Sequence, residues 1–103
     1  MNYKTIIIDM DGTICEDKST FERSLANMLP NAKEVINNWY DSGHTIIIYT
    51  ARGWSEYNMT KRWLDDFGVK YHQLLCGKPI GDVWIDDRAI KFESWDRIIN
   101  EIY

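Results

Sequence analysis

Short apolar runs alternate with amphipathic stretches along the chain. Runs rich in β-branched residues predict buried strands, and apolar residues that recur every three or four positions predict helices. The predicted strands span residues 3–9, 44–50, 71–76 and 82–86. The predicted helices span residues 31–42, 55–67 and 94–102. Asn31 and Ser94 are the expected N-caps of the first and last helices, with Glu34 completing a capping box after Asn31.

This alternation predicts an α/β fold in which a small, mostly parallel sheet carries helices on its faces. The apolar runs are continuous, which is typical of parallel strands that are buried on both sides. Open sheets of this kind bind ligands beyond the carboxyl ends of their strands. We therefore expect the functional side chains directly after the predicted strands.

Length, charge and composition restrict the domain count, the cellular compartment and the class of partner. The chain has 103 residues and a formal net charge of −4, and we expect one domain over residues 1–103. No apolar run approaches the ~20 residues of a membrane span, and the N-terminus lacks a signal-peptide layout, so we expect a cytoplasmic protein. The acidic net charge disfavours long nucleic acid as a partner. Cys15 and Cys76 are far apart in the sequence and form no CxxC motif. Two such unpaired thiols are typical of a protein in a reducing compartment.

Paired acids end two of the predicted strands. Asp9 and Asp11 end the first and lie two residues apart, so their side chains point to one side. Asp86 and Asp87 end the fourth. Like charges this close are costly unless a cation relieves them, and carboxylates are ligands that Mg²⁺ prefers. Either pair alone is also explained as an ordinary strand-end turn.

The two middle strand ends carry groups that suit an anion. Thr50 ends the second strand, and Lys78 follows the third in a Gly-Lys-Pro turn. Alone, Thr50 is explained as a helix cap and Lys78 as a surface lysine. Polar groups in this order at four strand ends nevertheless favour one shared site.

These segments together resemble the haloacid dehalogenase (HAD) superfamily of phosphohydrolases. Its four motifs occur in order as DMDGT at residues 9–13, Thr50, Lys78, and Asp86 with Asp87. The runs IIIDMDGTIC, HTIIIYTARG, LLCGKP and VWIDDRAI resemble the small HAD phosphatases found with capsule and other polysaccharide biosynthesis genes. The resemblance implies a Rossmann-like three-layer sandwich. The intervals between motifs leave no room for a cap domain, only for a flap at residues 14–30.

The resemblance also implies an activity, namely hydrolysis of phosphomonoesters through an aspartyl-phosphate. Asp9 would be the nucleophile, and Asp11 would protonate the leaving oxygen and then activate water. Mg²⁺ is the implied cofactor, held by Asp9, Asp11 through its backbone carbonyl, and Asp86. Asp87 would ligate the ion through water or orient the site.

The remaining implied site residues bind the phosphoryl group and the rest of the substrate. Lys78 would pair with Asp9 and a phosphoryl oxygen, and Thr50 would bind another oxygen together with the N–H groups of Met10 and Ala51. These are the positioning and electrostatic contributions that dominate phosphoryl transfer. Arg52 is a basic candidate for binding the non-phosphate part of the substrate.

The favoured substrate is a sugar phosphate or a similar small phosphorylated metabolite. Two alternatives stay open: a nucleotide or nucleic-acid-end phosphatase, and a phospho-accepting receiver-like signalling module. The receiver reading is weaker, because its phospho-acceptor acid belongs on a middle strand, where this chain has Thr50. An apolar stripe in the flap also suggests a homo-oligomer, in which the stripe would form part of the wall of a neighbouring subunit's active site. Its residues are Phe21, Leu25, Met28 and Leu29.

Overall fold

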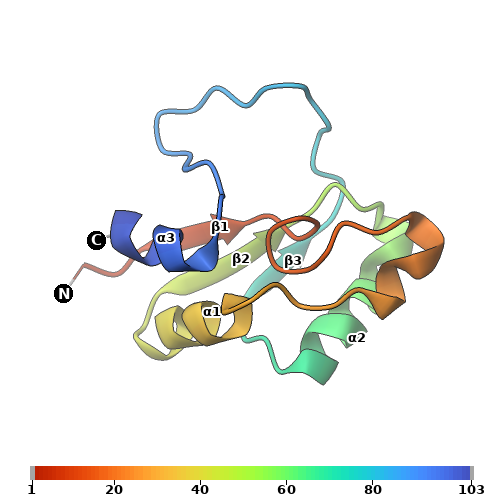
Figure 1. The fold of residues 1–103 in the computed structure, drawn as a ribbon, viewed down its shortest axis with the longest axis horizontal. Coiled ribbons are helices and arrows are strands. Elements are labelled where there is room, and N and C mark those ends of the chain that lie inside the picture. The colour runs from red at the N-terminus through yellow and green to blue at the C-terminus, as the bar shows by residue number, and fades with distance from the viewer. Residues whose placement is uncertain (1, 103) are drawn as a thin grey trace.

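Three parallel strands form the sheet, as a computed structural model that describes residues 2–102 shows (Figure 1). The strands are β1 (Thr5–Ile8), β2 (Thr45–Tyr49) and β3 (Gln73–Leu75), in the order β1-β2-β3. Ile8 pairs with Ile48, which in turn pairs with Leu74. This arrangement confirms the predicted α/β class and the parallel sheet.

The three predicted helices are confirmed, with their ends moved by one or two residues. They are α1 (Ala32–Asp41), α2 (Tyr57–Phe67) and α3 (Trp95–Glu101). Two 3-10 helices precede α1 and α2, namely η1 (Thr20–Leu25) and η2 (Trp54–Glu56). No helix in the described residues is long and apolar enough to cross a membrane.

One face of the sheet is buried against all three helices. Ile8, Ile48 and Leu74 share this face because strand side chains alternate and these residues are in register. One tryptophan from each helix joins the same apolar cluster: Trp39 of α1, Trp63 of α2 and Trp95 of α3. On the opposite face Ile7 is 63% exposed, so β1 is only half covered.

The strand predicted at residues 82–86 is wrong. This segment belongs to an open loop that runs away from the sheet between β3 and α3 (Figure 1). Val83 is 73% exposed and Ile85 is 95% exposed. An apolar run becomes a strand only where a neighbouring strand supplies hydrogen bonds. Here the run instead ends in a local turn, in which Asp86 Oδ1 accepts the N–H of Arg88 at 2.7 Å.

The capping box predicted at Asn31 is also wrong, whereas the cap at Ser94 is confirmed. Asn31 has a φ of 67°, and its side chain makes no capping bond. An N-cap needs extended backbone for its oxygen to reach the helix N–H groups. The Asn31 amide instead donates to Asp96 of α3 at 2.8 Å. The Ser94 hydroxyl oxygen accepts the N–H of Arg97, as predicted.

The flap at residues 14–30 contains only the short helix η1, so the predicted apolar stripe is split. Phe21 and Leu25 are 97% and 74% exposed, while Met28 and Leu29 pack against the core. The N–H of Leu29 donates to the carbonyl of Ile14, which folds the end of the flap back onto its beginning.

Candidate functional site

A tight turn after β1 presents the first acidic pair. The carbonyl of Met10 accepts the N–H of Ile14 at 2.8 Å, and Gly12 donates to Cys15 at the same distance. Gly12 has a φ of +79°, a conformation that L-residues with side chains rarely adopt. Met10 is fully buried under this turn. The turn thereby anchors the backbone on both sides of Asp11.

Asp11 is bound by Arg52 through a two-pronged ion pair. Arg52 donates from Nη2 to Oδ1 at 2.7 Å and from Nε to Oδ2 at 3.0 Å. The Arg52 side chain is 1% exposed, and its Nη1 donates to Thr60 of α2 at 3.0 Å. Burial disfavours the charged guanidinium, but the hydrogen bonds and charge of Asp11 outweigh burial and raise the pKa of Arg52.

This pairing changes the interpretation of Arg52. The sequence suggested a substrate contact, whereas the structure places the guanidinium inside the protein against Asp11. A strand-end arginine does not reveal its burial in the sequence pattern. The available signal was Thr60, a polar residue on the inward side of α2 with Trp63, because a buried hydroxyl needs a partner.

Cys15 lies beside this ion pair and is not a reactive thiol. Its Sγ is 3.9 Å from Asp11 Oδ1 and 3.8 Å from Arg52 Nη2. Burial and the negative charge of Asp11 raise the pKa of Cys15 to about 12, so the thiol stays protonated at neutral pH. This fits the expected structural role of a buried thiol.

Asp9 faces Lys78 across the ends of β1 and β3. Lys78 Nζ lies 3.4 Å from Asp9 Oδ1, and the two side chains are 20% and 39% exposed. Two backbone bonds fix the lysine turn to the loop after β2: Gly77 donates to the Arg52 carbonyl and Lys78 to the Thr50 carbonyl. The structure therefore brings the ends of all three strands together around one accessible carboxylate and one ammonium.

Thr50 lies at the centre of this junction but is fully buried. Its Oγ1 accepts the N–H of Arg52 at 3.1 Å, which is the capping role that the residue has without any ligand. Ala51 is exposed next to it. Of the predicted phosphate contacts, Lys78 and the loop at Ala51 are accessible, whereas Thr50 and Met10 are enclosed.

Asp86 and Asp87 lie apart from this centre, in the exposed loop. Arg88 Nε is 3.9 Å from Asp86 and 3.5 Å from Asp87, so both acids face a local cation. Among the described residues, no group of three or more acidic, histidine or cysteine side chains is placed to hold a metal ion. The carboxylates that Mg²⁺ prefers are present, but they are not gathered, and this arrangement does not fit the ion.

A family model described as the LNS2 domain of PITM 1-3 matches residues 6–102, which is nearly the whole chain. The chain belongs to the LNS2 domain family. LNS2 domains have a HAD-like phosphatase fold, which confirms the superfamily indicated by the sequence motifs. The comparison with curated proteins gave no match.

Solved structures agree with the LNS2 fold. A Vibrio cholerae protein is similar at a TM-score of 0.73 and 24% identity, covering 96% of this chain and 95% of its own. A chain of the Pnkp1/Rnl/Hen1 complex is similar at a TM-score of 0.64 and 19% identity, covering 82% of this chain. A chain in a second structure, of the Pnkp1/Rnl/Hen1 RNA repair complex, is similar at a TM-score of 0.63 and 19% identity, covering 97% of this chain. This LNS2 domain spans 30% of the matched chain in each of these two complexes.

Proposed function

We propose that this LNS2 domain hydrolyses phosphomonoesters through an aspartyl-phosphate on Asp9. One observation carries the proposal: an accessible carboxylate at the end of β1 faces a lysine held rigidly by the two neighbouring strand ends. The ammonium screens the carboxylate and offers a contact for the phosphoryl oxygens. Attack by a carboxylate divides a very slow hydrolysis into two faster steps.

In the first step, an Asp9 carboxylate oxygen forms a bond to phosphorus as the bond from phosphorus to the leaving oxygen breaks. The leaving oxygen takes a proton from Asp11. In the second step, water attacks phosphorus, its proton passes to Asp11, and the bond between Asp9 and phosphorus breaks to release phosphate. Both Asp11 oxygens accept bonds from Arg52, so one of these bonds opens when Asp11 holds the proton.

Mg²⁺ is the cofactor that this proposal implies, and the substrate is a sugar phosphate or similar metabolite, as for phosphatases of polysaccharide biosynthesis. Because Asp86 and Asp87 are not gathered with Asp9, no step above depends on the ion. Binding of the ion by this set of acids requires the loop that carries residues 86 and 87 to approach β1.

The test compares Asp9→Asn with Asp66→Asn, a matched change at an exposed acid of α2. We expect Asp9→Asn to abolish turnover of p-nitrophenyl phosphate in Mg²⁺, because an amide is not a nucleophile of the required strength. The Asp66 variant keeps the turnover of the unmodified protein. Turnover by Asp9→Asn within about tenfold of the unmodified protein, less than ~1.4 kcal/mol in the barrier, refutes the nucleophile assignment.

A further inference from the structure

Two tryptophans flank the turn that carries Lys78. Trp54 is 58% exposed and Trp84 is 56% exposed. The Lys78 ammonium lies 5.2 Å from the centre of the Trp84 ring, a cation–π contact. Large aromatic rings left half in water, beside the only accessible cation–carboxylate pair at the described strand ends, are typical of a ligand site rather than of a core.

Trp54 touches the lysine turn itself. A Cβ atom on Gly77 would lie 3.2 Å from Trp54 Nε1, so the glycine leaves room for the indole against the backbone. Gly77 directly precedes Lys78. The indole of Trp54 is therefore a neighbour of the turn that presents Lys78.

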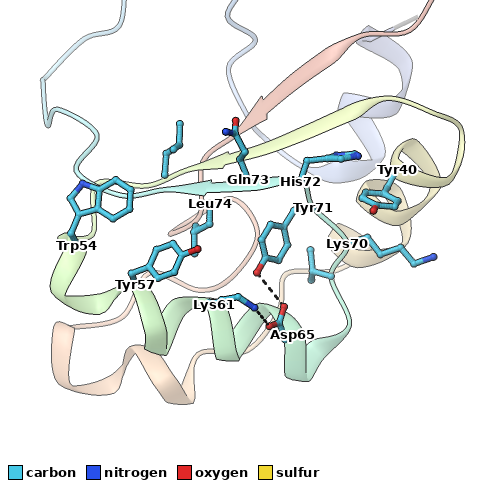
Figure 2. Close-up of a pocket in the computed structure, with 12 residues that line it drawn as sticks. Tyr40, Trp54, Tyr57, Lys61, Asp65, Lys70, Tyr71, His72, Gln73 and Leu74 are labelled. Carbon is cyan, nitrogen blue, oxygen red and sulfur yellow. Dashed lines mark hydrogen bonds and ion pairs between the residues drawn. The ribbon is translucent and has the colours of Figure 1, made fainter.

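Trp54 also lines a groove of about 790 Å³, a size that suits small-molecule ligands. Figure 2 shows Trp54 and Tyr57 at one end of the groove and Tyr40 and Lys70 at the other. β3 contributes one side and α2 the other. Trp54 thus belongs both to this groove, which follows the free edge of β3, and to the contact with Gly77 in the lysine turn.

The chemistry of the groove is mixed. Trp54 stacks on Tyr57 with ring centroids 5.8 Å apart and planes 23° from parallel, and the Trp54 residue is 58% exposed. Gln73 is exposed in the same groove, and Lys61 pairs with Asp65 at 2.7 Å. A single aromatic face with amide, ammonium and carboxylate groups nearby complements a sugar, which has one apolar C–H face and a rim of hydroxyls.

We propose that Trp54, supported by Tyr57, binds the sugar ring of a phosphorylated sugar whose phosphate is bound by Lys78 beside Asp9. The inference rests on the proposed function and names the residue that binds the sugar of its substrate. Trp54 acts as a specificity residue: it binds the leaving group before and during the reaction and does not touch the reacting atoms. Its loss therefore weakens substrate binding without changing the chemical step.

The test measures kcat and KM for a hexose phosphate, a nucleoside monophosphate and glycerol phosphate, which has no ring. The variants are Trp54→Ala, Trp54→Phe and the control Tyr3→Ala. Tyr3 is an equally exposed aromatic that precedes β1, at the opposite end of the sheet. We expect Trp54→Ala to raise KM for the hexose phosphate about tenfold at unchanged kcat. Trp54→Phe restores much of the affinity, and glycerol phosphate does not respond.

An equal KM change for the hexose and glycerol phosphates, or none, overturns the inference. A selective change for the nucleotide alone overturns the sugar assignment. Calorimetric binding of hexose phosphate and inorganic phosphate to Asp9→Asn, with and without Trp54→Ala, separates this inference from the proposed function. If the unmodified protein hydrolyses nothing, yet hexose phosphate binding depends on Trp54 and phosphate binding does not, catalysis is refuted while the subsite stands.

Discussion

Removal of Arg52 tests whether the buried ion pair holds the two loops of the site together. Arg52→Ala deletes both bonds to Asp11 and the bond to Thr60, and it leaves the Asp11 carboxylate without its partner. Breaking a buried pair from one side costs ~3–5 kcal/mol. Asp11 is 18% exposed, so water replaces part of the lost interaction, and we expect about 3 kcal/mol. For a domain of this length, that loss lowers Tm by roughly 12–24 °C.

The assay is urea unfolding followed by tryptophan fluorescence on Arg52→Ala, Asp11→Asn and the double variant. We expect a coupling free energy of about 2 kcal/mol, because the two residues act as one unit. The control is the exposed pair Lys70–Asp41, at 2.8 Å and about half exposed, whose coupling is ~0.5 kcal/mol or less. Equal coupling in the two pairs refutes the argument that burial makes the Arg52 pair strong.

Three further results are expected. Gly77→Ala destabilises the protein by ~1–2 kcal/mol in urea unfolding, because Gly77 has a φ of +77° and its Cβ would meet Trp54, whereas Gly81→Ala does not. Cys15, with its pKa raised to about 12 by burial and Asp11, resists iodoacetamide at pH 8 until the protein unfolds. The unfolded thiol ionises at its ordinary, lower pKa, so stability falls as pH rises above 9, and Cys15→Ala reduces that slope.

The sequence predicted those parts of the fold that local patterns and burial decide together. The isoleucine runs of β1 and β2 predicted parallel strands, and the structure pairs them in register. The expected burial on both sides is wrong for β1, because Ile7 is 63% exposed. The second helix was expected to end at residue 67, and it does so, followed by Gly68 with a φ of +76°. Such positions depend on one residue's own conformational freedom, which is visible in the sequence.

Predictions that depend on a partner elsewhere in the chain were less successful. Asn31 has the right chemistry for an N-cap, but its amide binds Asp96 across the domain. Arg52 stands beside Thr50, yet its guanidinium turns inward because Asp11 and Thr60 satisfy it there. A one-dimensional pattern records that a polar group needs a partner, not which partner the fold supplies.

The segment at residues 82–86 also depends on a partner elsewhere in the chain, and this dependence affects the whole site. Its apolar residues predict a strand only through burial, and burial requires a second apolar surface. That surface exists at β1, where Ile7 is 63% exposed, while Ile85 is 95% exposed in the loop. Residues 82–86 are not part of the sheet, so they do not cover β1. Asp86, at the end of this segment, is therefore not placed beside Asp9. The predicted metal site therefore stays a prediction, and it requires the loop that carries Asp86 and Asp87 to pair with β1.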